Sequence, residues 1–556
     1  MASGFADLVL TGGRVLTLDE DFTVASAVAV AGDRITAVGT DASVGKFIGP
    51  RTRVIGLDGR AVLPGINDAH LHLAMFGESA LTVDLTAVDS VAALRRTLED
   101  ATAGPADGQW LIGEGWREAG IAEFRTGEAV PHRSLLDPVT GERPALLHHV
   151  SRHSILVNTV ALHLAGIDRD TPDPVGGHIV RDAAGEPTGL LLESAGVLVS
   201  GHVPPRPEQQ RLDAIVSAMR TLNSLGVTSV TDPIVRPELL RDYLTLHRQG
   251  RMTVRVNALL HWDWPSPSTS LAGITTALRY AGVSTGLGDR WLRIGGVKLF
   301  ADGVPSHRTA WVNQPYPDGS CGHLVGPGAD DRERYTELLD IIETVHRHRL
   351  QVQVHVTGER AADAVIDGIA RAQEADPWPD ARHALIHGTL LSREAPARLA
   401  EHGIGVITSS LMKSHSGASM APVIGPDRWA RAFPAGELLT AGVLVADSSD
   451  APVTYPDWRR GLATFVGAAP HPLAEVAVEH RLTREQAIRL WTTAGARLEH
   501  AEHLKGSIGV GKLADLVVLE QDPMSVPDTA LRTLRPVLTL VGGRTVFDTE
   551  GSPSAR

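Results

Sequence analysis

The chain has 556 residues, enough for about three ordinary domains or for one large barrel with attachments. Its 52 Lys+Arg against 65 Asp+Glu leave a formal net charge of −13, which repels phosphate backbones and anionic membrane surfaces and disfavours nucleic-acid binding. Hydrophobic residues make up 43% and charged residues 21%, a composition typical of a globular protein with a sizeable core rather than of a disordered chain.

Cysteine usage and the N-terminal segment limit the cellular setting. The single cysteine, Cys321, excludes both an intramolecular disulfide and a cysteine-based metal site. The first residues, MASGFADLVLTGGRV, lack the basic flank and apolar core of a secretory signal, and no apolar run reaches the ~18 residues that span a bilayer. We therefore expect a cytoplasmic protein, with no membrane and no nucleic acid among its partners. A homo-oligomer remains open.

The two ends of the chain resemble each other. Residues 6–16 read ADLVLTGGRVL and residues 538–547 read LTLVGGRTVF, each a β-rich run, a Gly-Gly-Arg turn and another β-rich run. Further strands are indicated at residues 25–38 and 514–523. Because short strands with exposed edges are seldom stable alone, we expect residues 1–62 and 505–556 to form one composite β-sandwich domain.

Between these ends, residues 63–504 alternate apolar β-type runs with amphipathic helical patterns. The clearest helix covers residues 335–349, where Leu338, Leu339, Ile342 and Val345 share one face. Such alternation is typical of βα units around a parallel sheet, and we predict an α/β fold: a (β/α)₈ TIM barrel with inserted segments. The β-type runs are GVTSVTD (226–232), IGGVKLFADG (294–303), LQVQVHVTG (350–358), HALIHG (383–388), GIGVITSS (403–410) and GVLVADSSD (442–450).

Two stretches interrupt the alternation. Residues 77–205 carry many loop signals, and we interpret them as an insertion into the barrel. The Pro/Gly-rich residues 302–330 form a second interruption. Long loops of compact enzymes are usually lids or binding loops, so we expect both stretches near the functional site.

The segment LPGINDAHLHL (63–73) is the first to indicate metal binding. On a β-strand the side chains of His70 and His72 would project from the same face and could hold one ion, whereas the alternative is a pair of ordinary near-surface histidines. His346 and His348 have the same spacing but lie in a helical pattern, where residues two apart do not face each other. We interpret that second pair as ordinary solvated side chains.

Polar residues interrupt the C-terminal ends of four later β-type runs. These are Lys298 in GGVKLFADG, His355 in VQVHVTG, His387 in ALIHG and Asp450 in ADSSDAP. Barrel enzymes keep their catalytic groups at that end of the strands. Together with the first histidine pair, these side chains could converge as metal ligands at one barrel mouth.

The chain resembles the amidohydrolase superfamily, and within it the YtcJ-like branch that includes N-substituted formamide deformylases. The resemblance runs nearly from end to end, and the ordered set of motifs is far more specific than any one of them. The motifs are LPGINDAHLHL, GEGW (113–116), HSILVNTVAL (153–162), GEPTGLLLE (185–193), GVTSVTD, VKLFADG, VHVTGERA, ALIHG, SSDAPV and GSIGVGKLADLVVL (506–519).

The resemblance implies a set of metal ligands and one or two Zn²⁺ ions. It makes His70 and His72 ligands from the first strand, His355 and His387 ligands from the fifth and sixth strands, and Asp450 the acidic residue of the last. It also implies that Lys298 is carboxylated and bridges two metals, because a free ammonium has no acceptor and repels a cation. The alternative for this lysine is an ion pair with an acid such as Asp302.

The chemistry implied by the resemblance is metal-dependent hydrolysis. A metal ion lowers the pKa of bound water from about 15.7 to about 7, which gives hydroxide near neutral pH, and it polarises the scissile carbonyl. Asp450 would take the proton from the nucleophile and pass it to the leaving amine. Its alternative role is that of a ligand or a turn residue in SSDAP.

We therefore predict an enzyme that cleaves the C–N bond of a small-molecule amide, such as an N-substituted formamide or an N-acyl amine. One alternative is a metal-dependent hydrolase or isomerase of a cyclic amide, amidine or ester. Another is a non-catalytic scaffold on the same barrel, although such proteins typically lose metal ligands. Ile386, Glu359 and Ser449 depart from the residues of many relatives, so the resemblance says least about the substrate.

Four further residues are candidates for a substrate-binding pocket. Trp116, His153, Arg308 and His323 lie in or near the loops expected above the barrel mouth. Each could shape the pocket or hold a carbonyl or carboxylate group. Tryptophan and arginine are equally frequent as packing and surface residues, which is the alternative for each of them.

Overall fold

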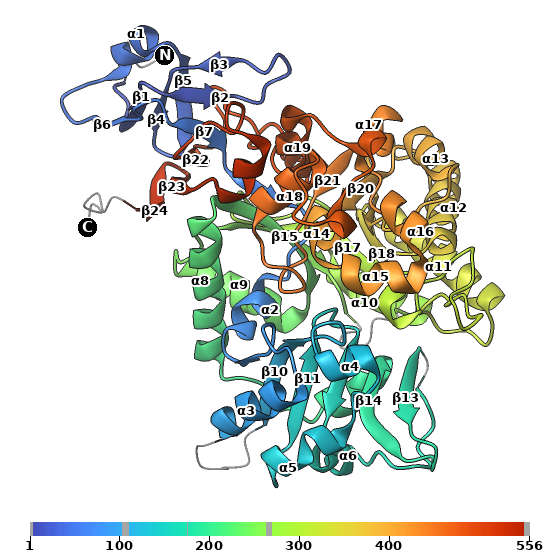
Figure 1. Ribbon diagram of the computed structural model, residues 1–556. Helices are drawn as coiled ribbons and strands as arrows, with labels where there is room; N and C mark the ends of the chain where they lie inside the picture. The colour runs from blue at the N-terminus through green and yellow to red at the C-terminus, as the bar shows by residue number, and fades with distance from the viewer. Residues whose placement is uncertain (1–3, 103–109, 175, 263–268, 550–556) are drawn as a thin grey trace.

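The centre of the molecule is an eight-stranded parallel sheet that curls into a nearly closed barrel, in the order β21-β20-β19-β18-β17-β16-β15-β8 (Figure 1). The computed structural model describes residues 4–102, 110–174, 176–262 and 269–549. At the seam the Ala69 N–H donates to the Asp447 carbonyl oxygen at 3.3 Å. The predicted barrel is thereby confirmed. Its strands are β8 (Ile66–Asp68), β15 (Val227–Val235), β16 (Arg255–Leu260), β17 (Leu292–Phe300), β18 (Val352–Val356), β19 (Ala384–His387), β20 (Gly405–Thr408) and β21 (Val445–Asp447).

Helices cover the outer face of the barrel, so its strands are buried on both faces, as the continuous apolar runs indicate. Every residue of β18, β19 and β20 is buried. The helix expected at 335–349 is α11 (Asp331–Arg347), which buries Leu338, Ile342 and Val345 against the sheet. Other covering helices are α8 (Glu208–Ser224), α9 (Pro237–Arg248), α10 (Leu271–Ala281), α12 (Glu359–Ala375) and α13 (Ala395–Glu401).

His346 on α11 is fully buried, so the interpretation of His346 as a solvated side chain was wrong. The Val352 N–H donates to Nδ1 of His383 at 2.9 Å, and a hydrogen bond of 2.8 Å joins His383 Nε2 to His346 Nδ1. Nε2 of His346 lies 2.7 Å from the Asp376 carbonyl oxygen. Nδ1 of His383 is an acceptor for the Val352 N–H, and Nε2 of His346 is a donor to the Asp376 carbonyl group. Each ring therefore carries a single proton, and both rings are neutral. His348, by contrast, is exposed.

This histidine pair predicts that stability falls with acidification. Burial, with His346 and His500 nearby, lowers the pKa of His383 to about 3, below its usual value near 6.5. Below pH 6.5 the unfolded chain therefore binds a proton at His383 that the folded chain does not bind. The contribution of the neutral His383 ring to stability is lost as pH falls toward 3. Between pH 7 and pH 5 the loss is about 2 kcal/mol. Denaturation midpoints followed against pH should fall less steeply for His383→Asn than for the wild type, whereas His348→Asn should keep the wild-type slope.

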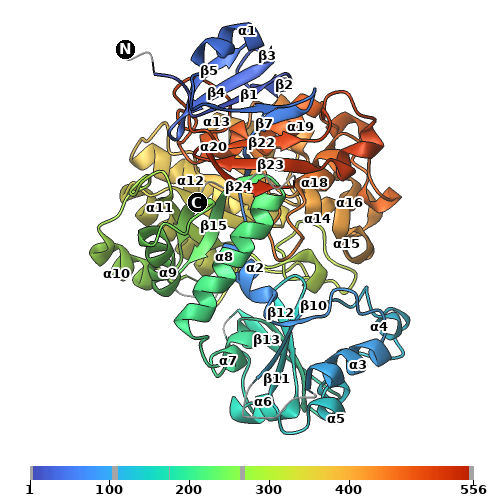
Figure 2. The same cartoon turned by 90° about the vertical axis from the view of Figure 1, so that its left-hand side faces the viewer.

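An inserted region with its own sheet lies between β8 and β15 and projects from the barrel (Figures 1 and 2). Much of the stretch for which the sequence indicated loops is thus regular structure. The sheet order is β13-β14-β12-β11-β10-β9, and its core gathers around Leu98, Trp116 and Leu147. The strands are β9 (Val83–Asp84), β10 (Leu111–Trp116), β11 (Ala145–His149), β12 (Ser154–Val157), β13 (Gly177–Arg181) and β14 (Pro187–Glu193).

Strands from the two chain ends combine in the remaining sheets. One sheet has the order β24-β23-β22-β7-β2-β3, in which β22 (Leu516–Leu519) pairs antiparallel with β7 (Ala61–Pro64). The other, β5-β4-β1-β6, comes from the N-terminal part alone, and both sheets contribute to one apolar cluster. This arrangement confirms the predicted fold class, while the domain boundaries stay a prediction. The remaining strands are β1 (Leu8–Thr11), β2 (Arg14–Leu16), β3 (Val24–Ala25), β4 (Ala27–Ala31), β5 (Arg34–Gly39), β6 (Arg53–Gly56), β23 (Pro536–Val541) and β24 (Arg544–Asp548).

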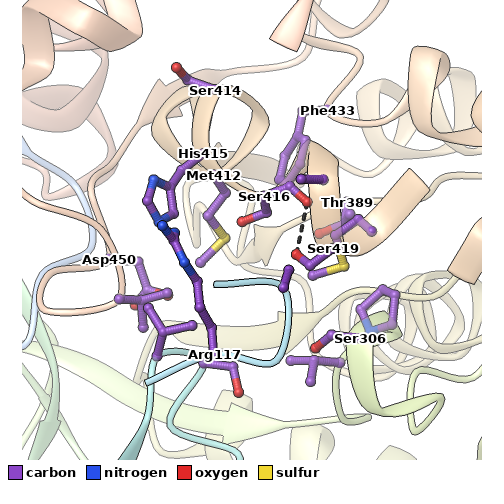
Figure 3. Close-up of a pocket in the computed structure, with 18 of the residues that line it drawn as sticks. Arg117, Ser306, Thr389, Met412, Ser414, His415, Ser416, Ser419, Phe433 and Asp450 are labelled. Atoms are coloured by element: carbon purple, nitrogen blue, oxygen red, sulfur yellow. Dashed lines mark hydrogen bonds between the residues drawn. The ribbon is translucent and has the colours of Figure 1, made fainter. Parts of the chain in front are cut away.

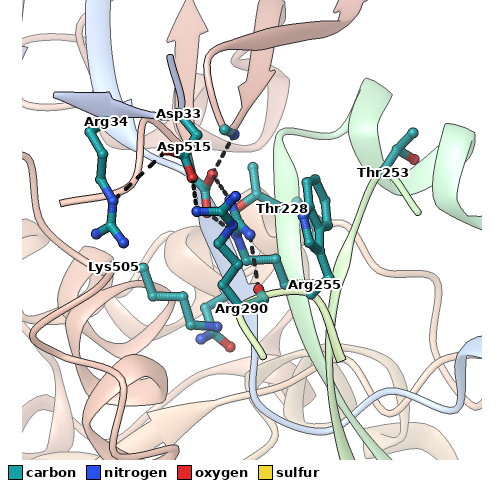
Figure 4. A network of polar contacts seen from close by, with 12 residues as sticks. Asp33, Arg34, Thr228, Thr253, Arg255, Arg290, Lys505 and Asp515 are labelled. Carbon is teal, nitrogen blue, oxygen red and sulfur yellow. Dashed lines mark hydrogen bonds and ion pairs between the residues drawn. The ribbon is translucent and has the colours of Figure 1, made fainter. Parts of the chain in front are cut away.

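A buried ion pair links the barrel to the sheet formed by both chain ends (Figure 4). Arg255 on β16 makes two parallel contacts with Asp515, Nε to Oδ2 at 2.6 Å and Nη2 to Oδ1 at 2.8 Å. The Gly542 N–H also donates to Oδ1 of Asp515, and the guanidinium lies 4.4 Å from the ring centre of Trp291. Such bidentate geometry is the strongest form of this interaction.

Replacing Asp515 by Asn is therefore expected to destabilise the protein by about 3–5 kcal/mol, because it leaves the Arg255 guanidinium buried without a counter-charge. The matched control is Asp33→Asn, which removes the more exposed ion pair of Asp33 with Arg290 (2.5 Å) and should cost less than about 1 kcal/mol. Denaturant unfolding of both variants measures the difference. Equal losses would contradict the assigned role of the buried pair.

In the part of the chain that the structure describes, no helix combines the length and the apolar character needed to cross a lipid bilayer.

Candidate metal centre and substrate cavity

The predicted ligands lie at the C-terminal ends of the barrel strands, where they line one small cavity of about 100 Å³. Lys298 lies near the end of β17, His355 near the end of β18, and His387 is the last residue of β19. His70 and His72 follow β8 instead of lying within it, and Asp450 follows β21. The residues lining this cavity are His70, His72, Met75, Ser151, Arg152, His153, Glu193, Ile234, Lys298, Phe300, His355, His387, Asp450 and Val453.

Asp450 holds the two N-terminal histidines together. Nε2 of His70 and Nε2 of His72 each lie 3.2 Å from Oδ1 of Asp450. The Asp450 backbone N–H also donates to the His70 carbonyl oxygen at 2.8 Å, which ties the end of β21 to the segment after β8. His387 and Asp450 have φ values of 70° and 55°, the left-handed region that residues with a Cβ seldom adopt. Such strain concentrates at functional sites.

Three imidazoles of this cavity have lowered pKa values. Burial is the main cause that lowers the pKa of His387 to about 4 and holds the pKa values of His70 and His355 well below their usual range. Burial alone would raise the pKa of Asp450, but hydrogen bonds from His70 and His72 outweigh it and keep that pKa well below its usual value. Neutral imidazoles and an ionised carboxylate are the states in which these side chains bind metal ions.

The arrangement of His70, His72 and Asp450 fits a divalent cation. Their potential ligand atoms all lie within 4.8 Å of one another. Nδ1 of His70 and Nδ1 of His72 are buried without a hydrogen-bond partner among the described residues. Asp450 is only 5% exposed, and its carboxylate contacts His70 and His72. Two nitrogen donors and one buried carboxylate form a donor set that zinc and similar first-row metals accept.

Lys298 lies deep in the same cavity without an ion pair to a described carboxylate. Its Nζ is 4.5 Å from the ring centre of Phe300, and burial lowers the pKa of Lys298 to about 7. Asp302, the acid weighed as its partner, instead accepts backbone N–H groups of Trp311, Thr357 and Gly358. A lysine amine with this pKa has a substantial unprotonated fraction near neutral pH, which is the form that carboxylation requires.

His355 and His387 are neighbours in an edge-to-face arrangement, with ring centres 4.8 Å apart and ring planes at 79°. Nε2 of His355 lies 3.1 Å from the Gly303 carbonyl oxygen, and Nδ1 of His387 lies 3.2 Å from Oγ of Ser409. Each ring thus has one nitrogen fixed by a neighbour and one nitrogen left for a ligand. Such outer contacts orient metal-binding histidines.

His153 enters the cavity from the inserted region. Its Nδ1 lies 2.8 Å from Oε2 of Glu193, whose Oε1 accepts from Oγ1 of Thr309 at 2.7 Å. Burial alone would lower the pKa of His153, but Glu193 outweighs it and raises that pKa above the usual value. The ring centre of His153 is 5.3 Å from that of His355. A histidine paired with a carboxylate therefore lies beside the predicted ligands.

Trp116, Arg308 and His323 are the other three candidates for the substrate pocket. They line neither this small cavity nor the larger cavity beside it. Trp116 is 1% exposed and lies in the core of the inserted region, where its Nε1 donates to the Leu147 carbonyl oxygen at 3.1 Å. Arg308 is exposed and pairs with Asp318 at 2.6 Å. His323 is half-buried in the segment 302–330.

A larger cavity of about 670 Å³ opens onto the same histidines (Figure 3). His153, His355, His387 and Asp450 line both cavities. Arg117 enters this cavity from the loop after β10, while Met412 and His415 belong to α14 (Ser410–His415). Sequence reasoning missed these lining residues. None of them belongs to a motif on which the family resemblance rests.

A second group of potential ligands, Glu118, His149 and His307, lies at the rim of this cavity. The Ser151 N–H donates to Nδ1 of His149 at 3.0 Å, so Nε2 of His149 carries the proton and points at Glu118 Oε2, 2.9 Å away. This tautomer leaves His149 no lone pair for a cation. The group is a hydrogen-bonded pair, Glu118 and His149, beside a second histidine, His307.

Comparison with known proteins agrees with this geometry. The YtcJ protein of Bacillus subtilis (strain 168) is 31% identical over 97% of this chain and 98% of its own length. The N-substituted formamide deformylase of Arthrobacter pascens is 28% identical over 98% of this chain and 99% of its own. An uncharacterized metal-dependent hydrolase from Pyrococcus horikoshii OT3 shares the fold, with a TM-score of 0.73, 23% identity and coverage of 94% and 99%.

The profile of one sequence family spans most of the chain, from residue 53 to residue 547, and so covers the barrel strands together with every predicted ligand. The chain therefore belongs to the amidohydrolase family.

Proposed function

We propose that this chain is a metal-dependent hydrolase that cleaves the C–N bond of a small-molecule amide, an N-substituted formamide or another N-acyl amine. The observation that carries the proposal is the convergence of two histidines on one carboxylate oxygen, Oδ1 of Asp450. The 28% identity to an N-substituted formamide deformylase over nearly the whole chain supports the choice of bond.

His70, His72 and Asp450 would hold one Zn²⁺ ion, and His355 with His387 would hold a second if Lys298 carries a carboxylate. When bound, such a cation supplies Lewis acidity, which acidifies water and polarises a carbonyl group. The unprotonated amine of Lys298 favours carboxylation, since an ammonium could neither react with carbon dioxide nor bind a cation.

The protein's own groups would move the proton. Oδ1 of Asp450 faces His70 and His72, while Oδ2 has no hydrogen bond from the described residues and Asp450 lines the substrate cavity. We infer that Oδ2 accepts a proton from the attacking water and delivers it to the amide nitrogen as the C–N bond breaks. The products are a carboxylic acid, formate in the case of a formamide, and the free amine.

His153 would orient the acyl group. Because Glu193 engages Nδ1 of His153 and favours the charged ring, Nε2–H remains as a donor toward the cavity. A charged donor of this kind stabilises the negative charge that develops on the carbonyl oxygen during attack.

The test combines elemental analysis with a substrate screen. Protein purified in zinc should contain at least one ion per chain, and it should release amine and acid from formamides or N-acyl amines. A chelator should abolish this activity and added zinc should restore it. Turnover of cyclic imides or esters alone would support the alternative hydrolase, and less than about one ion per chain would support a non-catalytic scaffold.

A further inference from the structure

One wall of the larger cavity carries an excess of positive charge. Arg117, Arg460 and Arg532 line this cavity, and the carboxylates among its lining residues are Glu118 and Asp450. Both carboxylates are engaged by histidines, Glu118 by His149 and Asp450 by the His70/His72 pair. The excess is notable in a chain whose formal net charge is −13.

Arg117 is the central residue of this wall. Its Nη1 donates to Nε2 of His415 at 2.6 Å, and no described carboxylate lies within ion-pair distance of its guanidinium. Figure 3 shows the Arg117 side chain extending from the inserted region toward the His415 ring. A guanidinium has five N–H donors, so this single contact leaves most of them available to a ligand.

His415 adds no counter-charge. Desolvation, with Arg117, Arg460 and His471 nearby, lowers the pKa of His415 to about 4. The neutral ring accepts from Arg117 and so fixes the orientation of the guanidinium. Asp457 contacts both Arg460, at 3.4 Å, and Arg459, at 2.6 Å. The positive charge of Arg460 is therefore only weakly compensated.

The apolar part of the lining comes mainly from α14, α15 (Gly417–Ile424) and the segment that follows. Met412, Met420, Trp429 and Phe433 belong to it. The cavity of about 670 Å³ has the size of a small-molecule site and reaches from the cationic wall to Asp450. This combination of arginine and apolar side chains in the lining matches a ligand with an apolar middle and an anionic end.

We propose that Arg117, held by His415 and assisted by Arg460, binds a carboxylate of the substrate. This proposal rests on the hydrolase function above and names its substrate class: an N-acyl amine whose apolar body ends in a carboxylate. Guanidinium groups recognise carboxylates through two parallel hydrogen bonds, a geometry that a neutral carboxamide cannot reproduce.

The first experiment compares substrates that differ only in this group. N-formyl and N-acetyl derivatives of 6-aminohexanoate and 4-(aminomethyl)benzoate are assayed beside the corresponding primary carboxamides. We expect kcat/KM to be ~10–10²-fold higher for the carboxylates, which is the range for one charge-assisted contact. In Arg117→Gln this ratio should fall to about 1 through loss on the carboxylates alone. Arg347→Gln, a matched control on the outer helix α11, should keep the wild-type ratio.

The second experiment measures binding without turnover. Calorimetric titration with 4-phenylbutyrate and with the neutral 4-phenylbutan-1-ol uses ligands that contain no amide. The carboxylate should bind ~10-fold or more tightly than the alcohol to the wild type, equally with the alcohol to Arg117→Gln, and at an intermediate level to Arg117→Lys. If Arg117→Gln does not fold, the substrate comparison and the calorimetric titration are carried out on Arg460→Gln and Arg117→Lys instead.

The outcomes separate this proposal from the hydrolase function. If none of the amides is hydrolysed but 4-phenylbutyrate binds through Arg117, the hydrolase function is wrong and the carboxylate subsite stands. If amides are hydrolysed equally with and without a carboxylate, and Arg117→Gln leaves the ratio unchanged, the subsite is wrong and the hydrolase function stands.

Discussion

Turnover is expected to fall by ~10²–10⁴-fold when Asp450 is replaced by Asn, while the fold remains intact. The amide has the size of the carboxylate and still accepts hydrogen bonds from Nε2 of His70 and His72, so the local packing is kept. It cannot accept a proton from water and return it to the leaving nitrogen. Steady-state kinetics at saturating zinc measure the loss that remains once metal occupancy is restored.

The control for this variant is Asp289→Asn, which makes the same chemical change beside the start of β17, at the opposite end of the strand from Lys298. It should retain wild-type turnover. Circular dichroism and the metal content of both variants show whether either change disturbs the fold or the site. Near-normal turnover of Asp450→Asn at full metal occupancy would remove Asp450 from the mechanism.

The barrel could be predicted because each of its strands can be recognised from a short stretch of sequence. Parallel strands buried on both faces read as short apolar runs, and the runs at 350–358, 383–388 and 403–410 became β18, β19 and β20. The polar residues that end such runs also meet at one edge by topology, which is why Lys298, His355 and His387 could be placed together before any contact was known.

The prediction that His70 and His72 lie close together was based on a β-strand geometry that the structure does not have at these residues. β8 ends at Asp68, so the two histidines are not successive outward residues of one strand. What brings them together is Asp450, some 380 residues later in the chain, whose carboxylate oxygen both rings approach at 3.2 Å. Spacing within a motif could not reveal a partner so distant.

Burial of polar side chains was the least predictable property. His346 lies on the inner side of α11 because its ring joins His383 and the Asp376 carbonyl group, a network assembled from three separate segments. Trp116 likewise lies in the core of the inserted region, although its motif suggested a pocket. Composition and periodicity do not encode these contacts.

The cationic wall of the substrate cavity could not be predicted at all. Arg117 and His415 are 298 residues apart, and neither belongs to a motif that indicates binding. The inserted region and the loop after β20 had to be placed against each other before their side chains could meet. The proposed carboxylate subsite thus depends on contacts between segments far apart in the chain, while the proposed ligands follow from the barrel topology.

Replacing both His70 and His72 by Ala is expected to abolish tight metal binding, with a loss of affinity greater than ~10²-fold. Removing outer contacts of metal ligands alone costs 10–100-fold, and this change removes two ligands at once. The group of His70, His72 and Asp450 would then keep only one of its three potential ligands. Elemental analysis after dialysis against zinc, together with competition by a chelator of known affinity, measures the change.

A matched variant separates this effect from a general loss of surface histidines. His178 and His503 are exposed and lie outside the cavity, so His178→Ala/His503→Ala removes the same number of imidazoles without touching the proposed ligands. Its metal content should equal that of the wild type. If the His70/His72 variant also kept a full complement of metal, the cation would have to bind elsewhere, and the convergence of these two rings on Asp450 would then be a structural hydrogen-bond cluster rather than a metal site.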